Sequence, residues 1–466
     1  MDDQNTPNST VAKRQNDDEQ TGTLASLTKV RRTFSGDIIL PENAAYEQAR
    51  AVFARKGSPA IIFECKNAED VALAIRYARE AKLIISVRSG GHSNAGLSTN
   101  DGGVVIDVGP MNQVTLIDEN THRVRVGAGA QWGDIARKLN EYGLVLSSGD
   151  TVSVGAGGLS LGGGIGWMVR KYGLAIDNLV QVDIVTAEGE QLIASADSHP
   201  DLFWALRGGG GNFGVATAFE FIAHPSGDVS FGTIVYPAQN APALLTAWRD
   251  YMRTAPEDLT TTAMLIPSMA KDMPATFIVT VCWAGDQAAA AAALEPLRKL
   301  PGTIMNDSVQ VKPYYEALEE AHPPQGFHSE VNNAFFHELS DELIAKITTA
   351  FAEHKFIFQI RHLGGVMNRV PVDATAFAHR DSEVLVVSPV FLPLNSTEDQ
   401  IQTALAPWHD IAALGKGAYI NFFSRATPKE VAAAYPPATY QRLATIKQRY
   451  DPTNVFNQNL NIVPNA

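Results

Sequence analysis

Apolar residues along this chain follow two periods, one typical of helices and one typical of strands. Residues 68–80 carry apolar side chains at helical spacing, with Glu69 and Asp70 in the first turn, which predicts an amphipathic helix. Further helices are predicted over residues 132–142, 201–207 and 287–300, and strands over residues 83–87, 104–108, 124–126, 179–186, 215–223, 356–363 and 383–391. Because helices and strands alternate with connections of uneven length, the sequence predicts an α+β fold with mixed sheets.

The pattern divides the chain into four segments. Residues 1–30 are polar, mixed in charge and without the apolar core of a signal peptide, which predicts a disordered tail. Residues 31–225 form a first domain. Residues 226–422 alternate strands with alanine-rich helices, which predicts a second domain with an antiparallel sheet covered by helices. Residues 423–466 form a short C-terminal segment, in which four of the eight residues 454–461 are asparagine.

Composition narrows the class of protein. The 466 residues contain 37 Lys and Arg against 50 Asp and Glu, a net charge of −13 without a basic run, so no nucleic-acid partner is expected. No apolar window is long enough to predict a membrane span. Cys65 and Cys282 lie in apolar runs and are predicted to be buried thiols, and no spacing of Cys or His predicts a metal site. We expect a cytoplasmic protein that is a monomer or a homodimer.

Two glycine motifs resemble a dinucleotide fingerprint only in their letters. Residues 209–214 match G-x-G-x-x-G, but a predicted helix precedes them and a strand follows, the reverse of the order that the fingerprint requires. Residues 127–129 do follow a strand, but Trp132 stands where the third glycine would close against the helix. Ordinary turns explain these glycines better, and no P-loop is present.

Two other glycine segments indicate a bound ligand. Residues 151–166 contain seven glycines among alternating apolar residues, a pattern typical of backbone packed closely against another backbone or a flat molecule. At residues 88–93 a strand ends in Arg88, Ser89, Gly90, Gly91 and His92. Successive backbone N–H groups in such a turn can face one anion, and an arginine can add charge, although an ordinary glycine turn with an exposed histidine fits the same residues.

With these segments in place, the chain resembles a known family from about residue 34 to residue 462. The resemblance is densest at VRSGGHSNAGLSTNDGGVVIDVGPMN (87–112), VGAGGLSLGGGIGWMVRKYGLAIDN (154–178), DLFWALRGGGGNFGVAT (201–217) and YDPTNVFNQNLNI (450–462). These four motifs, in this order, are similar to those of the FAD-linked oxidases of the vanillyl-alcohol oxidase superfamily, in its berberine-bridge-enzyme-like branch.

The resemblance implies a fold, a cofactor and the residues that bind it. Residues 31–225 would be a two-part FAD-binding domain of the PCMH type, residues 226–422 the substrate-binding domain, and residues 423–466 a return to the FAD-binding domain. His92 matches the histidine that bonds to the 8α-methyl carbon of the flavin. The implied cofactor-binding residues are Arg88, Ser89, Gly90, Gly91, His92, Ser93, Gly149, Thr151, Val152, Val154, Gly155, Gly157, Gly158, Gly162, Gly163, Gly166, Trp167, Asn212, Gly214, Val215, Asn459 and Asn461.

Three positions refine what the resemblance implies. Many members bind FAD a second time through a cysteine, but the matching position is Thr151, so only the histidyl link is expected. The last tyrosine of the family's Y-x-N-Y stretch can act as a base, and here it is Phe422, which cannot accept a proton. Val154 matches a position where a small side chain accompanies oxygen access, which favours an oxidase over a dehydrogenase.

The expected reaction is hydride transfer from a small organic substrate to the flavin, followed by reduction of O2 to H2O2. Tyr419 is the first candidate for the base, on a predicted strand that places Asn421 on the same face. His328 and His362 in the second domain are further candidates, although each fits a structural histidine as well. An amine that binds in its neutral form needs no base. The alternatives are a flavin dehydrogenase with another acceptor and a non-catalytic FAD-binding protein.

Overall fold

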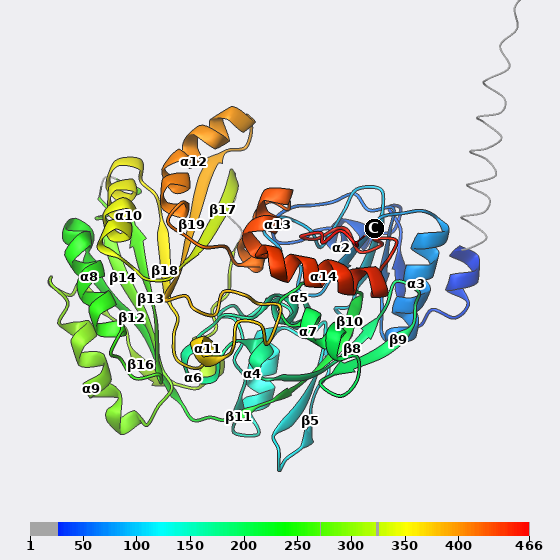
Figure 1. Cartoon of the computed structure of the whole chain (residues 1–466), viewed down its shortest axis with the longest axis horizontal. Helices are drawn as coiled ribbons and strands as arrows, with labels where there is room; N and C mark the ends of the chain where they lie inside the picture. The colour runs from blue at the N-terminus through cyan, green and yellow to red at the C-terminus, as the bar shows by residue number, and fades with distance from the viewer. Residues whose placement is uncertain (1–26, 271, 323–325, 466) are drawn as a thin grey trace, which may run out of the picture.

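Figure 1 shows the computed structural model, which describes residues 27–270, 272–322 and 326–465. Most of the segment predicted to be a disordered tail lies outside these residues. Its last part, however, is helical from residue 27, and Leu27 and Val30 are buried in the main hydrophobic core. The predicted boundary at residue 30 is therefore wrong by a few residues, because the spacing of these two side chains gives the segment an apolar face.

The first part of the molecule contains a mixed sheet with the strand order β1-β2-β4-β3. Its strands are β1 (Asp37–Ile39), β2 (Ile61–Glu64), β3 (Ile85–Arg88) and β4 (Val104–Asp107), and helix α3 (Ala68–Glu80) joins β2 to β3. Strand β4 pairs in parallel with both β2 and β3. Helix α3 begins where Asn67 accepts a hydrogen bond from the Asp70 N–H, and its bounds are those predicted from the sequence.

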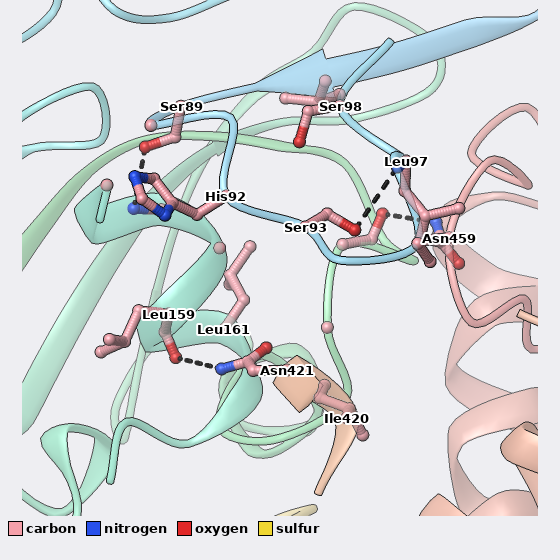
Figure 2. A pocket seen from close by; sticks show the side chains of 18 of the residues that line it. Ser89, His92, Ser93, Leu97, Ser98, Leu159, Leu161, Ile420, Asn421 and Asn459 are labelled. Atoms are coloured by element: carbon pink, nitrogen blue, oxygen red, sulfur yellow. Dashed lines mark hydrogen bonds between the residues drawn. The ribbon is translucent and has the colours of Figure 1, made fainter. Parts of the chain in front are cut away.

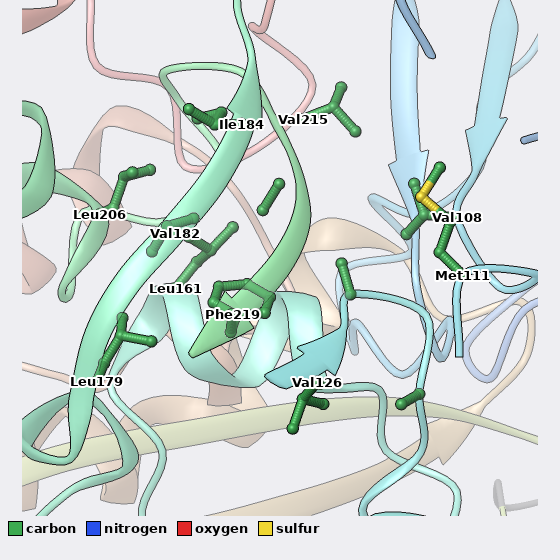
Figure 3. Packing of buried hydrophobic residues seen from close by; sticks show 14 of the residues in the cluster. Val108, Met111, Val126, Leu161, Leu179, Val182, Ile184, Leu206, Val215 and Phe219 are labelled. Atoms are coloured by element: carbon green, nitrogen blue, oxygen red, sulfur yellow. The ribbon is translucent and has the colours of Figure 1, made fainter. Parts of the chain in front are cut away.

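A second, antiparallel sheet completes this part, with the order β5-β6-β10-β8-β9. Its strands are β5 (Val114–Asp118), β6 (Arg123–Gly127), β8 (Leu179–Val185), β9 (Gln191–Ser195) and β10 (Val215–Ile222). Helices α4 (Trp132–Asn140), α5 (Ala156–Gly162), α6 (Val169–Tyr172) and α7 (Pro200–Leu206) lie between these strands in the chain, and β7 (Leu144–Val145) pairs with β11 (His224–Pro225). Leu161 of α5 packs beside Val182 and Phe219 of the sheet (Figure 3). The glycine-rich segment thus contains a short buried helix.

The second part is built on an eight-stranded sheet with the order β15-β12-β14-β13-β18-β19-β17, with β16 paired to β12. Its strands, which pair antiparallel, are β12 (Val229–Pro237), β13 (Leu259–Ile266), β14 (Thr276–Trp283), β15 (Asn306–Asp307), β16 (Gln310–Lys312), β17 (Phe327–Phe336), β18 (Phe358–His362) and β19 (Val384–Pro393). Helices α8 (Ala241–Met252), α9 (Gln287–Arg298), α10 (Asp341–His354) and α12 (Glu398–Ala412) pack on the outer side (Figure 1). The predicted antiparallel sheet covered by helices is therefore confirmed.

The C-terminal segment returns to the first part of the molecule. Helices α13 (Pro428–Ala434) and α14 (Pro437–Tyr450), drawn in red in Figure 1, pack near the N-terminal strands drawn in blue, and Leu443, Phe456 and Ile462 belong to the same buried core as those strands. Buried side chains from both parts of the molecule therefore belong to one hydrophobic core. No helix among the described residues is long and apolar enough to span a membrane.

One predicted element is wrong in a way that affects the site. The sequence predicts Tyr419 on a strand, but this residue directly precedes η4 (Ile420–Phe422), a 3-10 helix of one turn. The backbone N–H and C=O of Tyr419 pair with the side-chain amide of Asn333 on β17, at 2.6 Å and 3.2 Å, instead of with a neighbouring strand. Because a side chain satisfies these backbone groups, no strand is needed there.

Candidate cofactor and substrate site

A cavity of about 380 Å³ opens where the first part of the molecule meets the C-terminal segment. Its wall includes residues 89–95 after β3, residues 149–151, residues 154, 155, 157–159 and 161 around α5, residues 210–212, residues 419–423 and residues 458–460. Figure 2 shows His92, Leu161, Asn421 and Asn459 around this space. The volume lies within the range of about 300–1,000 Å³ that is typical of small-molecule pockets.

His92 lies in this wall with its ring fixed on two sides. The Phe53 ring stacks on the imidazole with 4.8 Å between ring centroids. The imidazole Nε2 lies 2.9 Å from Ser153 Oγ, which is hydrogen-bonded in turn to the Glu320 carboxylate. Burial lowers the pKa of His92 below its usual value, against the opposing charge of Glu320. The imidazole is therefore neutral near pH 7 and can act as a nucleophile.

Two glycine-containing turns touch each other beside His92. A Cβ atom added to Gly90 would lie 2.3 Å from the Gly155 N, and one added to Gly155 would lie 2.2 Å from the Gly90 N. Glycine is required at both positions because the two backbones are in contact. The predicted close packing of glycine-rich backbone is thus explained here by another backbone.

Two other glycines face empty space instead. A Cβ atom added to Gly158 or Gly211 would meet nothing within 4 Å, and both residues line the cavity. Close to them, the Tyr435 hydroxyl and Asn459 Oδ1 are buried and find no hydrogen-bond partner among the residues that the structure describes. Open backbone surface beside unpaired polar atoms fits a flat molecule with polar edges, such as the FAD that the family resemblance implies.

The predicted cofactor-binding residues divide into two groups. Those that line the cavity are Ser89, Gly90, Gly91, His92, Ser93, Gly149, Thr151, Val154, Gly155, Gly157, Gly158, Asn212, Gly214 and Asn459. Those that do not are Arg88, Val152, Gly162, Gly163, Gly166, Trp167, Val215 and Asn461. The structure therefore brings together the turn at His92, the start of α5 and Asn459 around one cavity, and their role in binding a cofactor stays a prediction.

The Arg88 guanidinium forms an ion pair within the protein. Parallel pairing of β3 with β4 places Arg88 directly opposite Asp107. Its Nε and Nη2 donate to Asp107 Oδ2 at 3.0 Å and 2.6 Å, and its Nη1 donates to the Ala49 C=O. Arg88 thus stabilises the strand end that carries His92. Its expected contribution of charge to a phosphate stays a prediction.

The other residues outside the wall support it from behind. A Cβ atom added to Gly162 would lie 2.3 Å from Asn421 Oδ1, and one added to Gly166 would lie 2.4 Å from the Ser148 C=O. Trp167 packs edge-on against Phe231 with 5.3 Å between ring centroids. These glycines let neighbouring segments approach, which places Asn421 against α5.

Tyr419 and Asn421 also line the cavity. The Tyr419 hydroxyl accepts hydrogen bonds from the Gly164 N–H at 2.9 Å and from Asn421 Nδ2 at 2.8 Å. The predicted proximity of the two side chains is correct, although the 3-10 turn produces it. Burial raises the pKa of Tyr419 to about 12, so the phenol keeps its proton at neutral pH.

The two candidate histidines of the second part do not line the cavity. His328 on β17 is hydrogen-bonded to Glu330 at 2.8 Å. His362 on β18 is buried against Trp248, with 6.0 Å between ring centroids, and burial lowers its pKa to about 3. Neither is placed to accept a proton from a molecule in the cavity, so the structural interpretation of both is favoured.

Sequence reasoning missed several residues of the site. Phe53, Ser153 and Glu320 surround His92, and Tyr435 and Gln458 line the far wall. Ser153 lies inside the glycine-rich segment and Gln458 inside the asparagine-rich C-terminal motif, so the sequence pointed to the segments of both. Phe53, Glu320 and Tyr435 lie outside the quoted motifs, and the fold alone brings them to the site.

Comparison with known proteins agrees with this geometry. Residues 59–195 match the FAD binding domain family, and residues 418–463 match the family described as berberine and berberine like. (R)-6-hydroxynicotine oxidase of Paenarthrobacter nicotinovorans is 30% identical, over 95% of this chain and 99% of its own length. The crystal structure of 6-hydroxy-D-nicotine oxidase from Arthrobacter nicotinovorans covers 93% of this chain and 99% of its own at a TM-score of 0.83 and 29% identity.

A sugar-oxidising relative has the same fold. Xylooligosaccharide oxidase from Myceliophthora thermophila, solved with xylobiose, covers 96% of this chain and 100% of its own at a TM-score of 0.82 and 25% identity. The fold and the cavity are thus those of an FAD-dependent oxidoreductase. Within that class, the chain belongs to the berberine-bridge-enzyme-like branch of the vanillyl-alcohol oxidase superfamily, as its motifs predicted.

Proposed function

We propose that this protein is an FAD-linked oxidase that carries its flavin on His92 and oxidises a small organic substrate with a CH–OH or CH–NH group. The observation that carries the proposal is one cavity whose wall contains a neutral histidine, open glycine surface, polar atoms that are unpaired among the described residues and a buried tyrosine. When bound, FAD supplies the hydride acceptor, and dioxygen is the final acceptor, giving hydrogen peroxide.

The bond to His92 follows from the chemistry of a neutral imidazole. With FAD bound, one imidazole nitrogen would replace a hydrogen on the 8α-methyl carbon, forming a C–N bond while a C–H bond and an N–H bond break. The two electrons and two protons released would pass to dioxygen as hydrogen peroxide. Thr151 stands where a cysteine would provide a second bond, so we propose the histidyl bond alone.

Tyr419 and Asn421 are proposed to hold the substrate. The Tyr419 oxygen accepts two N–H hydrogen bonds, so its own O–H remains to point at a substrate oxygen or nitrogen. Its pKa of about 12 makes it a donor at neutral pH and a base only after it loses that proton. A substrate amine that binds in the neutral form fits this arrangement without a protein base.

The test is acid precipitation of the purified protein, with His92→Ala as the control. Yellow pellets from the wild type and colourless pellets from the variant support the histidyl bond. Yellow supernatants from both leave a flavoprotein with FAD held non-covalently. A wild-type preparation that is colourless and cannot be reconstituted with FAD refutes the proposal.

A screen of alcohols, sugars and amines then separates the kinds of flavoprotein. Val154, which lines the cavity, supports oxygen access and hence peroxide release in step with substrate oxidation. Flavin reduction with electrons passed only to an artificial acceptor would instead indicate a dehydrogenase, and no flavin bleaching by any compound would indicate a binding protein. The cytoplasmic location and the monomeric or homodimeric state stay predictions.

A further inference from the structure

Hydrogen bonds connect His92 to two side chains that lead away from the cavity. The His92 Nε2 lies 2.9 Å from Ser153 Oγ, and Ser153 Oγ is hydrogen-bonded to the Glu320 carboxylate. A serine hydroxyl has one proton, and a carboxylate only accepts. Ser153 therefore donates its proton to Glu320, and its oxygen accepts the Nε2–H of His92.

This direction of bonding decides which nitrogen of His92 can react. A neutral imidazole has one N–H, and here it is on Nε2, so the lone pair is on Nδ1. Among the described residues, nothing hydrogen-bonds Nδ1. The stacked Phe53 ring, at an interplanar angle of 24°, holds the plane of the imidazole. Nδ1 is thus free to form a bond while Nε2 is occupied.

The carboxylate that ends the chain of hydrogen bonds is itself held in place. The Val152 N–H donates to the Glu319 C=O at 2.9 Å, and the Glu319 N–H donates to the Asp150 C=O at 3.0 Å. These two bonds tie the backbone beside Ser153 to the backbone beside Glu320. The Ala321 N–H also donates to Glu320 Oε1 at 3.3 Å. The contact between Ser153 and Glu320 is therefore supported by the backbone on both sides.

We propose that Ser153 and Glu320 are positioning residues that prepare Nδ1 of His92 for the attachment of FAD. The inference rests on the proposed histidyl bond and adds two positioning residues to it. As an Nδ1–C8α bond formed and a methyl C–H bond broke, the imidazole would gain positive charge, which the Glu320 carboxylate would stabilise through Ser153. The Nε2 proton would leave along the same path. This proton, the proton from the methyl group and the two electrons would together reduce dioxygen to hydrogen peroxide.

The experiment follows attachment itself, without reference to turnover. The full chain and its variants are incubated with excess FAD in air, and samples are precipitated with acid over time. Flavin retained in the pellet gives the rate of covalent attachment, and flavin bound before precipitation gives the occupancy. The variants are Ser153→Ala, Ser153→Thr, which keeps the hydroxyl, and Glu320→Gln. Glu316→Gln removes another exposed carboxylate of the same segment as a matched control.

We expect Ser153→Ala and Glu320→Gln to slow attachment by about tenfold or more, the size of effect seen when outer partners of a functional histidine are removed. Occupancy should stay near that of the wild type, and Ser153→Thr and Glu316→Gln should attach FAD at the wild-type rate. Rescue by threonine separates the role of the hydroxyl from simple packing.

Each contrary outcome has its own meaning. Wild-type rates in Ser153→Ala and Glu320→Gln overturn the inference and leave the histidyl bond intact. Because Glu320 is exposed, Glu320→Gln gives this answer even if Ser153→Ala does not fold. A wild type whose FAD is bound but never retained in the pellet overturns the histidyl bond and the inference together. A wild type that binds no FAD overturns the proposed function.

Discussion

Replacing Lys447 of α14 with methionine should destabilise the protein and loosen the cofactor wall. The Lys447 ammonium is fully buried and pairs with the equally buried Asp451 at 3.2 Å. It also donates to the Asn212 C=O at 3.0 Å and to the Phe456 C=O at 2.9 Å. The Asn212 side chain in turn holds the backbone at Leu460, at 3.1 Å. One ammonium therefore joins α14, the loop before β10 and the C-terminal tail.

The expected cost follows from the charge left behind. Methionine has a similar length but no proton to donate. Among the described residues, the buried Asp451 carboxylate then keeps the Val455 and Phe456 N–H groups as hydrogen-bond donors and loses its cation. Removing one partner of a buried ion pair costs about 3–5 kcal/mol. The assay is urea unfolding followed by tryptophan fluorescence, with flavin emission as a second signal.

A double variant and a surface control test the reasoning. Adding Asp451→Asn to Lys447→Met should recover part of the loss, because the uncompensated charge is removed. Lys429→Met, at an exposed position of α13, should change the free energy of unfolding by less than about 0.5 kcal/mol. A loss below about 1 kcal/mol for Lys447→Met, or a double variant less stable than the single, would refute the argument.

Three further predictions address the cavity, its tyrosine and a buried histidine. Gly158→Leu should fold yet bind at least about tenfold less FAD, because the leucine side chain fills the open wall of the cavity. Gly158→Ala should keep FAD, and normal flavin absorbance in Gly158→Leu would contradict the prediction. Tyr419→Phe should retain its flavin, but flavin reduction in anaerobic stopped-flow mixing with substrate should be at least about tenfold slower, as expected for loss of one hydrogen bond to the reacting group. An unchanged rate excludes a hydrogen bond from Tyr419 to the substrate. The pKa of His362 is lowered by burial to about 3 in the folded state, whereas the unfolded chain binds a proton near pH 6.5, so stability falls with decreasing pH between these values. His362→Met should remove about 1.4 kcal/mol per pH unit from that slope between pH 5.5 and 4.5, measured by urea unfolding, and an equal slope would exclude a buried neutral histidine.

The fold was predictable wherever a local pattern was sufficient. Residues 68–80 form the helix that their apolar spacing and cap predicted, with the same bounds. Tyr419 and Asn421 show the limit, because alternation of two side chains fits a strand and a 3-10 turn equally. The Asn333 amide, 86 residues earlier in the chain, decides between them by binding the Tyr419 backbone. Such contacts leave no periodic signal.

The site was predictable where its residues are adjacent in sequence. The turn that carries His92 and the glycine-rich segment before α5 were both found, because glycine restricts what such segments can do. The partner of Arg88 was missed because it depends on the register between β3 and β4. The link from Ser153 to Glu320 was missed because 167 residues separate them. Chemistry that depends on sheet register or on a distant loop is decided by tertiary structure.

The glycines of one short segment show why composition alone cannot tell a packing glycine from one that faces a ligand. Gly155 is glycine because the Gly90 backbone touches it, Gly162 because the Asn421 amide does, and Gly158 faces the open cavity. An added methyl group would overpack the first two contacts, at a cost of about 1–3 kcal/mol each, whereas alanine at Gly158 would instead favour the helix by about 0.5–1 kcal/mol. Since alanine would be stable at Gly158, folding does not require glycine there, and the open wall has room for a methyl group as well. The open space beside this position, and not a need for glycine, is therefore the reason to propose this face of α5 as part of the cofactor wall.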